Sequence, residues 1–203
     1  TGLLKTPASI MGFILIGSFI LIAIFAPVSA PPVGSDPYKI PRDGFGGEPQ
    51  TMGTEWSRNV PEVPFWYKPI TGKDEWVHLL GTAQGQYDIF YGIIWGTRTA
   101  FKTGFIVVVS TFLIGIIIGS ISGFYGGTVD NVIMRIVDIF MTLPFILMAL
   151  IMAAVLTPVI GKSLLPSIIA LISFGWMGYA RIIRGDILSI KERDFVLAAR
   201  IVG

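Results

Sequence analysis

Four long apolar stretches set the pattern of hydrophobic and polar residues in this chain: Ala8–Ala26, Thr99–Ser122, Val132–Leu156 and Leu165–Arg181. The hydrocarbon core of a bilayer is about 30 Å thick, and an α-helix of about 17–25 residues crosses it. Each stretch has that length. The pattern therefore predicts an all-α integral membrane protein with four spans.

The first stretch also has features of a secretory signal, because Lys5 precedes it and small residues follow it at Ala26–Ala30. However, its apolar run is longer than the usual core of a signal, and Pro27 lies beside the candidate cleavage site. We interpret residues 8–26 as a retained first transmembrane helix.

Composition agrees with a membrane protein, since 53% of the residues are hydrophobic and only 14% are charged. A single soluble domain of this composition would expose too much apolar surface to water. The net charge of +2 gives no reason to expect a nucleic-acid partner. The sequence contains no cysteine, which excludes disulfides and thiolate metal sites.

Basic residues gather after the fourth stretch, at Arg181, Arg184, Lys191, Arg193 and Arg200. Positive charge in short segments beside spans marks the cytoplasmic side. Counting back through four crossings also places the N-terminus in the cytoplasm, and residues 27–97 form an extracytoplasmic segment. Arg98 and Lys102 are exceptions to this rule.

Residues 27–97 are rich in proline and glycine and have no helical or strand period. A mostly irregular insert of this length is usually functional or disordered, and its aromatic residues argue against disorder. Trp56, Trp66, Tyr67 and Trp76 are compatible with a small folded cap. They are equally compatible with an aromatic belt at the lipid headgroups.

Small and ionisable residues mark two of the spans. Gly115, Gly119 and Gly123 are spaced by four residues, which predicts a smooth helix face for close packing with another helix. In the third span, Arg135 and Asp138 form either an ion relay or a pair on one helix face; we favour the pair, because they lie three residues apart. Pro144 predicts a kink.

Candidate catalytic groups are scarce. His78 is the only histidine, and one histidine makes neither a metal cage nor a catalytic triad. Gly161-Lys162-Ser163 resembles the end of a phosphate-binding loop, but Leu156 occupies the position where that motif requires its first glycine. We predict no enzyme activity, and any ATP that the system uses must bind to another polypeptide.

The last residues form the most specific segment. Phe195, Ala198, Ala199 and Val202 recur at three- and four-residue steps, which predicts a short amphipathic helix with a small apolar face. Gly203 is suited to end that helix. The segment is too short and too charged to span a membrane, so we predict that it docks into a groove of a partner.

This segment resembles the cytoplasmic Glu-Ala-Ala loop of the membrane subunits of ABC importers, with Leu197 in place of the glutamate. The resemblance extends upstream to the oligopeptide, dipeptide and nickel branch, to the subunit with a long extracytoplasmic segment between its first two spans. His78, Leu80-Gly81-Thr82, Gly85 and Asp88 match that branch's signature, whereas Leu79, Ala83 and Gln86-Tyr87 depart from it. Further matches are Tyr91-Gly92, Thr97-Arg98, Gly123–Gly127, Met134-Arg135, Val137-Asp138, Pro144 and Gly175–Arg181.

The resemblance implies a type I ABC importer transmembrane-domain fold, with that domain at residues 98–203. It implies a permease subunit in the cytoplasmic membrane of a prokaryote that imports dipeptides or oligopeptides, or alternatively oligosaccharides or nickel. Expected partners are a second permease, two ATPase subunits that bind ATP and Mg²⁺, an extracytoplasmic solute-binding protein and lipid. The implied ATPase-docking residues are Arg193, Phe195, Ala198, Ala199, Arg200 and Gly203.

Such subunits have two further spans after this loop, so we expect the sequence to be a portion of a longer subunit. Two other classes of protein compete with this interpretation. An ATP-independent channel or secondary transporter would use Arg135 and Asp138 directly. A membrane anchor would bind its partner through residues 27–97 alone.

Overall fold

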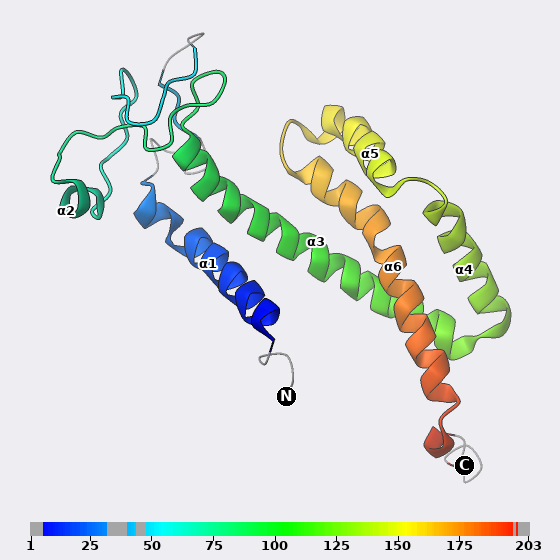
Figure 1. Cartoon of the computed structure of the whole chain (residues 1–203). Coiled ribbons are helices and arrows are strands. Elements are labelled where there is room, and N and C mark those ends of the chain that lie inside the picture. Colours follow the sequence, from blue (N-terminus) through cyan, green and yellow to red (C-terminus); the bar gives the residue numbers. More distant parts are fainter. Residues whose placement is uncertain (1–5, 32–39, 44–47, 197, 199–203) are drawn as a thin grey trace. The chain divides into compact units, whose positions relative to one another are not determined.

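The computed structural model describes residues 6–31, 40–43, 48–196 and 198. Six α-helices lie in this part of the chain (Figure 1): α1 Pro7–Ser29, α2 Tyr67–Thr71, α3 Ile89–Tyr125, α4 Gly127–Met141, α5 Phe145–Ile160 and α6 Leu165–Lys191. Where the chain is described, extended segments meet only at isolated β-bridges. The chain forms two compact units, residues 1–102 and 103–203, and α3 runs through the boundary.

The first unit consists of α1, the start of α3 and a folded cap, which we define as residues 40–43 and 48–88. Trp56, Tyr67 and Trp76 are buried in its core together with Tyr91 and Trp95. Because these aromatic rings pack against one another, the structure favours the cap over the aromatic belt. Indole N–H groups fasten the cap and α3 to the end of α1, since Trp66 Nε1 donates to the Ser29 carbonyl and Trp95 Nε1 to the Ala30 carbonyl, both at 3.0 Å.

A buried polar cluster lies at the centre of the cap. His78 is fully buried, with Nδ1 2.7 Å from Asp88 Oδ2 and Nε2 3.3 Å from Asp43 Oδ2. The other oxygen of Asp88 accepts from the Tyr91 amide in the first turn of α3. The Trp56 ring lies 3.8 Å from the His78 ring, centroid to centroid. This cluster joins three loop segments to the start of α3.

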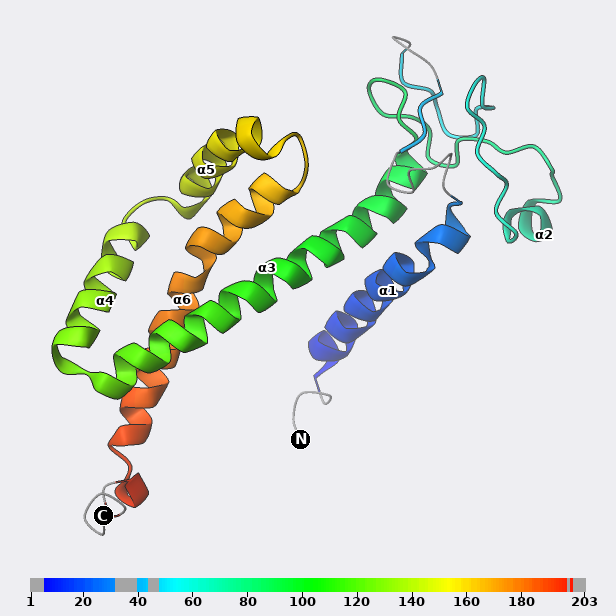
Figure 2. The same ribbon diagram turned by 180° about the vertical axis from the view of Figure 1, so that it is seen from behind.

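The second unit is built on close contact between α3 and α6. A Cβ atom at Gly115 would lie 2.5 Å from Tyr179 Cβ, and one at Gly119 would lie 2.5 Å from the Ala180 carbonyl oxygen. At Gly123 the nearest atoms belong to Ile187. Successive glycines therefore meet successive turns of α6, so the two helices run parallel, and both views show their C-terminal parts side by side (Figures 1 and 2).

The predicted third span, Val132–Leu156, is not one helix. It is divided into α4 and α5, which differ in direction by 86°. Pro144 lacks an amide proton and disfavours a helical conformation at Leu143, which explains why α4 ends here. Pro144 then caps the start of α5 with an extended backbone (ψ 115°). The sequence predicted a kink at this residue, whereas the structure has a complete break.

The parallel arrangement of α3 and α6 bears on how the bent pair α4–α5 is counted among the spans. Helices α1, α3 and α6 are each long and apolar enough to span a bilayer, and α4 with α5 qualifies as a fourth, broken span. Because α3 and α6 run in the same direction, the chain must return across the bilayer between them. Counting α4 and α5 as that one crossing gives up to four spans by length and composition, the number that the sequence predicts.

Candidate site for coupling and passage

The predicted docking residues follow the end of α6. Glu192 and Arg193 form a turn, and residues 194–196 and 198 are helical. Phe195 is 65% exposed, and Arg193 and Ala198 are also exposed. The other predicted docking residues, Ala199, Arg200 and Gly203, lie outside the described residues, as does Leu197. The described part of this segment therefore presents an aromatic side chain at its surface.

Two polar contacts hold α6 against the α3–α4 corner. Arg184 donates from Nε and Nη2 to the two carboxylate oxygens of Asp130, and Ser122 Oγ donates to the same carboxylate. Lys191 Nζ lies 3.2 Å from the Gly123 carbonyl and 2.8 Å from that of Phe124. We call Ser122, Asp130, Arg184 and Lys191 the α6 clamp.

The α6 clamp is a specific arrangement. Asp130 and Ser122 are buried, and a two-pronged arginine–carboxylate contact fixes orientation as well as distance. The three glycines of α3 allow α6 to approach closely enough for these side chains to meet. The helix that leads into the docking segment is thus attached to α3 by glycine packing and by Lys191, and to α4 by the Arg184–Asp130 ion pair.

Asp138 has a different partner from the one that the sequence predicted. Its carboxylate pairs with Arg181 of α6 rather than with Arg135 of its own helix. Arg181 reaches Asp138 because α6 packs along α4, a contact that spacing within one helix does not reveal. Both side chains of this pair are about half exposed. The pair adds a second ionic contact between α4 and α6.

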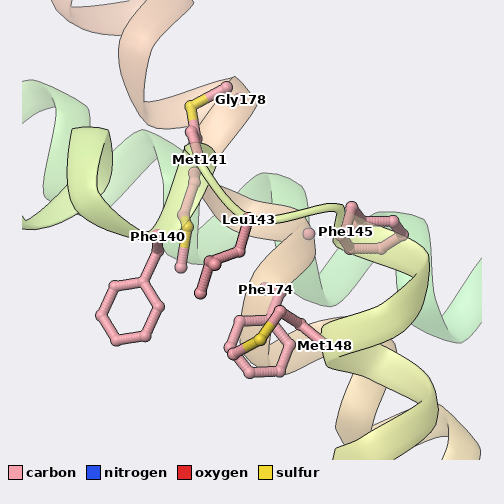
Figure 3. A pocket seen from close by; sticks show the side chains of 9 residues that line it. Phe140, Met141, Leu143, Phe145, Met148, Phe174 and Gly178 are labelled. Atoms are coloured by element: carbon pink, nitrogen blue, oxygen red, sulfur yellow. The ribbon is translucent and has the colours of Figure 1, made fainter.

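An apolar pocket occupies the inside of the break between α4 and α5 (Figure 3). Its volume is about 410 Å³. Phe140, Met141, Leu143, Phe145 and Met148 come from the broken span, and Phe174, Gly175, Met177 and Gly178 come from α6. These lining residues carry no titratable side chain, so the chemistry of the pocket suits apolar groups. Methionine side chains are flexible and adapt to guests of different shape.

Metal-binding clusters are absent from the described part of the chain. No cluster of three or more histidine or acidic residues there has the geometry to hold a metal ion. The single histidine, His78, is enclosed by Asp43 and Asp88 without exposure to solvent. Its position fits a structural role in the cap.

Comparison with known proteins agrees with this arrangement. Residues 115–203 match the family "Binding-protein-dependent transport system inner membrane component". This match covers the end of α3, the broken span, α6 and the segment after it. The chain is thus a multi-pass membrane protein that carries the membrane domain of this family at residues 115–203.

Similar proteins define the branch. The chain is 31% identical over 98% of its length to the dipeptide transport system permease protein DppC of Alkalihalophilus pseudofirmus, and covers 55% of it. It is 34% identical over 96% of its length to the oligopeptide permease OppC of Bacillus subtilis (53% covered). It is 36% identical over 62% of its length to the nickel permease NikC of Escherichia coli (44% covered). The chain belongs to this peptide and nickel branch and spans about half the length of these relatives.

Proposed function

We propose that this chain is part of the permease subunit of an ATP-driven, binding-protein-dependent importer of dipeptides or oligopeptides. The observation that carries the proposal is the helical segment described at residues 194–196 and 198, with Phe195 and Ala198 exposed, which follows α6 close to the α6 clamp. Two of the similar permeases are named for peptide transport. Nickel and oligosaccharides are the alternative solutes.

The proposed mechanism is a lever. The docking segment would sit in a groove of a cytoplasmic ATPase subunit, and two such subunits would bind ATP and Mg²⁺. Their closure would move the docking segment, and α6 would carry this motion into the membrane because the α6 clamp ties it to α4 and the glycine face ties it to α3. Because these contacts hold the helices together, a movement of α6 would also move α3 and α4.

The proposal assigns a role to each remaining part. The chain would lie in the cytoplasmic membrane with its N-terminus in the cytoplasm, and the cap would receive a solute-binding protein on the other side. A second permease would complete the pathway. Irregular backbone at membrane depth is tolerated where it lines a cavity, so the pocket at the α4–α5 break is the candidate pathway wall.

Replacing Ala198 by arginine tests the docking segment. The large charged side chain should prevent insertion into the ATPase groove, so solute uptake and solute-stimulated ATP hydrolysis should both fall to background. Both are measured on the full-length transporter in proteoliposomes. Ser189→Arg is the matched control, because Ser189 is also small and exposed but lies on α6 before the docking segment.

Three outcomes of this experiment are decisive. Loss of uptake with retained membrane insertion, and with activity kept in the control, supports the proposal. Unchanged uptake in Ala198→Arg contradicts docking at this segment. Uptake that continues without ATP in the unaltered protein would instead favour a channel or secondary transporter.

A further inference from the structure

One side chain of the cap projects away from the cap's own core. Phe65 is 73% exposed, although Pro64 and Tyr67 on either side of it are buried and Trp66 is partly buried. The Trp66 ring is hydrogen-bonded to Ser29 at the end of α1, so the backbone around Phe65 is held in place. An exposed phenylalanine on a fixed backbone needs an explanation outside the cap core.

Phe65 faces an apolar groove on α1. The groove has a volume of about 360 Å³, and its lining residues are Leu21, Ile22, Phe25, Val28, Ser29, Phe65 and Trp66. Leu21 and Phe25 are each more than half exposed, and they belong to a helix that qualifies as a membrane span. The groove is therefore continuous with the apolar surface that α1 presents to the bilayer.

The depth of the groove fits the boundary between headgroups and acyl chains. Counting from Ser29 at about 1.5 Å per residue, Phe25 lies roughly 6 Å and Leu21 roughly 12 Å below the end of α1. Interfacial apolar side chains typically insert about 5–10 Å into this boundary. Charges follow on the cap side, where Lys68 and Asp74 form an exposed ion pair at 2.7 Å. Helix α2, which carries Lys68, lies beside the Ser29 end of α1 in both views (Figures 1 and 2).

We propose that Phe65 and the α1 groove bind lipid acyl chains of the leaflet at the Ser29 end of α1. The cap is then anchored twice, through its tryptophan hydrogen bond to α1 and through Phe65 in the bilayer. In this proposal Phe65, rather than the neighbouring tryptophans, is the aromatic side chain that lies in the lipid. This inference is independent of the transported solute and of ATP coupling.

Single-cysteine variants that carry a nitroxide label give a direct test; residues 1–203 contain no cysteine, and any cysteine elsewhere in the transporter is first replaced by serine. Phe65→Cys is compared with Phe25→Cys on the exposed face of α1 and with Met52→Cys, a 71% exposed cap residue outside the groove. The full-length transporter is reconstituted in phosphatidylcholine vesicles. Electron paramagnetic resonance then measures label relaxation by oxygen, which partitions into lipid, and by a water-soluble nickel chelate.

The label at Phe65 should resemble that at Phe25, with oxygen relaxation exceeding nickel relaxation, and the label at Met52 should show the reverse order. Dominant nickel relaxation at Phe65 would overturn the proposal in favour of water. Weak relaxation by both agents would overturn it in favour of a protein partner.

A second measurement stays valid even where the cysteine variant disturbs the cap. In the unlabelled transporter, acyl chains brominated near the headgroup should quench tryptophan fluorescence, and Trp66→Phe should remove part of that quenching because Trp66 lines the same groove. Quenching that is identical with and without Trp66 would contradict lipid in the groove.

Discussion

At the scale of single residues, the cap depends on the Asp43 carboxylate, whose two oxygens contact different parts of the cap. Asp43 is fully buried; its Oδ1 accepts from the Ser57 amide at 2.8 Å and from the Arg58 amide, while Oδ2 faces His78. Burial raises the pKa of Asp43, but these hydrogen bonds together lower it by more, so the net pKa lies below its ordinary value of 3.8. The ionised form of Asp43 is therefore the form that stabilises the cap.

The sign of this shift gives a pH prediction. A carboxyl group whose pKa is lower in the folded protein than in the unfolded chain stabilises the fold fully at any pH above its unfolded pKa. This stabilisation is lost as the pH falls through the pKa of the folded state. We expect the cap to loosen below about pH 3.8. Near-ultraviolet circular dichroism of the buried tryptophans in the purified transporter measures this loss.

Asp43→Asn should lower stability at neutral pH by roughly 1–3 kcal/mol and flatten the acid dependence, because the neutral amide no longer titrates. Asp74→Asn is the control, since Asp74 is 78% exposed and its ion pair contributes little. Identical acid curves for Asp43→Asn and the unaltered protein would contradict the assigned role.

At the scale of helices, the glycine face of α3 sets how closely α6 approaches. Gly119→Ala should destabilise the second unit by about 1–3 kcal/mol, because the new methyl group would meet the Ala180 carbonyl and force the helices apart. Gly104 lies on the same helix, and a methyl group there would have nothing within 4 Å, so Gly104→Ala should be neutral or stabilising. Thermal unfolding of the two purified variants in detergent separates these outcomes, and equal midpoints would argue against close α3–α6 packing.

At the scale of the whole molecule, the α6 clamp links helix packing to the proposed coupling. Removing one partner of a fully buried ion pair costs about 3–5 kcal/mol, because the other charge is left uncompensated; the cost at Asp130 should be smaller, since the Arg184 side chain is 30% exposed. Asp130→Asn should therefore loosen α6 and lower the amount of solute imported for each ATP hydrolysed. Uptake and ATP hydrolysis are measured together in proteoliposomes of the full-length transporter.

A charge exchange distinguishes positioning from general damage. Asp130→Arg combined with Arg184→Asp should restore part of the ratio between uptake and hydrolysis, since the pair is re-formed in reverse. The matched single variant Asp138→Asn should have a smaller effect because the Asp138–Arg181 pair is half exposed. A normal ratio in Asp130→Asn would show that the clamp has no part in coupling.

The sequence predicted the long apolar helices α1, α3 and α6 well because length and apolar character are local properties. It underestimated the length of α3, which begins at Ile89 rather than near Thr99. The helix extends through a polar turn beyond the apolar stretch, toward the cap. It identified Pro144 but predicted one kinked span instead of two helices, since the 86° bend also depends on the packing of α5 against α6.

The polar contacts were largely beyond sequence reasoning. Arg184 and Asp130 are 54 positions apart, and Arg184 carried information only as a cytoplasmic charge. His78 is solitary in the sequence because its partners, Asp43 and Asp88, lie 35 and 10 positions away. Only the signature that contains His78 and Asp88 pointed to this site, without assigning the two residues a shared role.

The parallel packing of α3 and α6 has one more consequence, which concerns helix dipoles. The C-terminal end of a helix carries about half a negative charge, and parallel neighbours bring two such ends together. Lys191 belongs to the last turn of α6 and binds the Gly123 and Phe124 carbonyls near the end of α3, so one ammonium group compensates both ends. Lys191, which the sequence used as a mark of the cytoplasmic side, thus also offsets the repulsion between the two parallel helix dipoles.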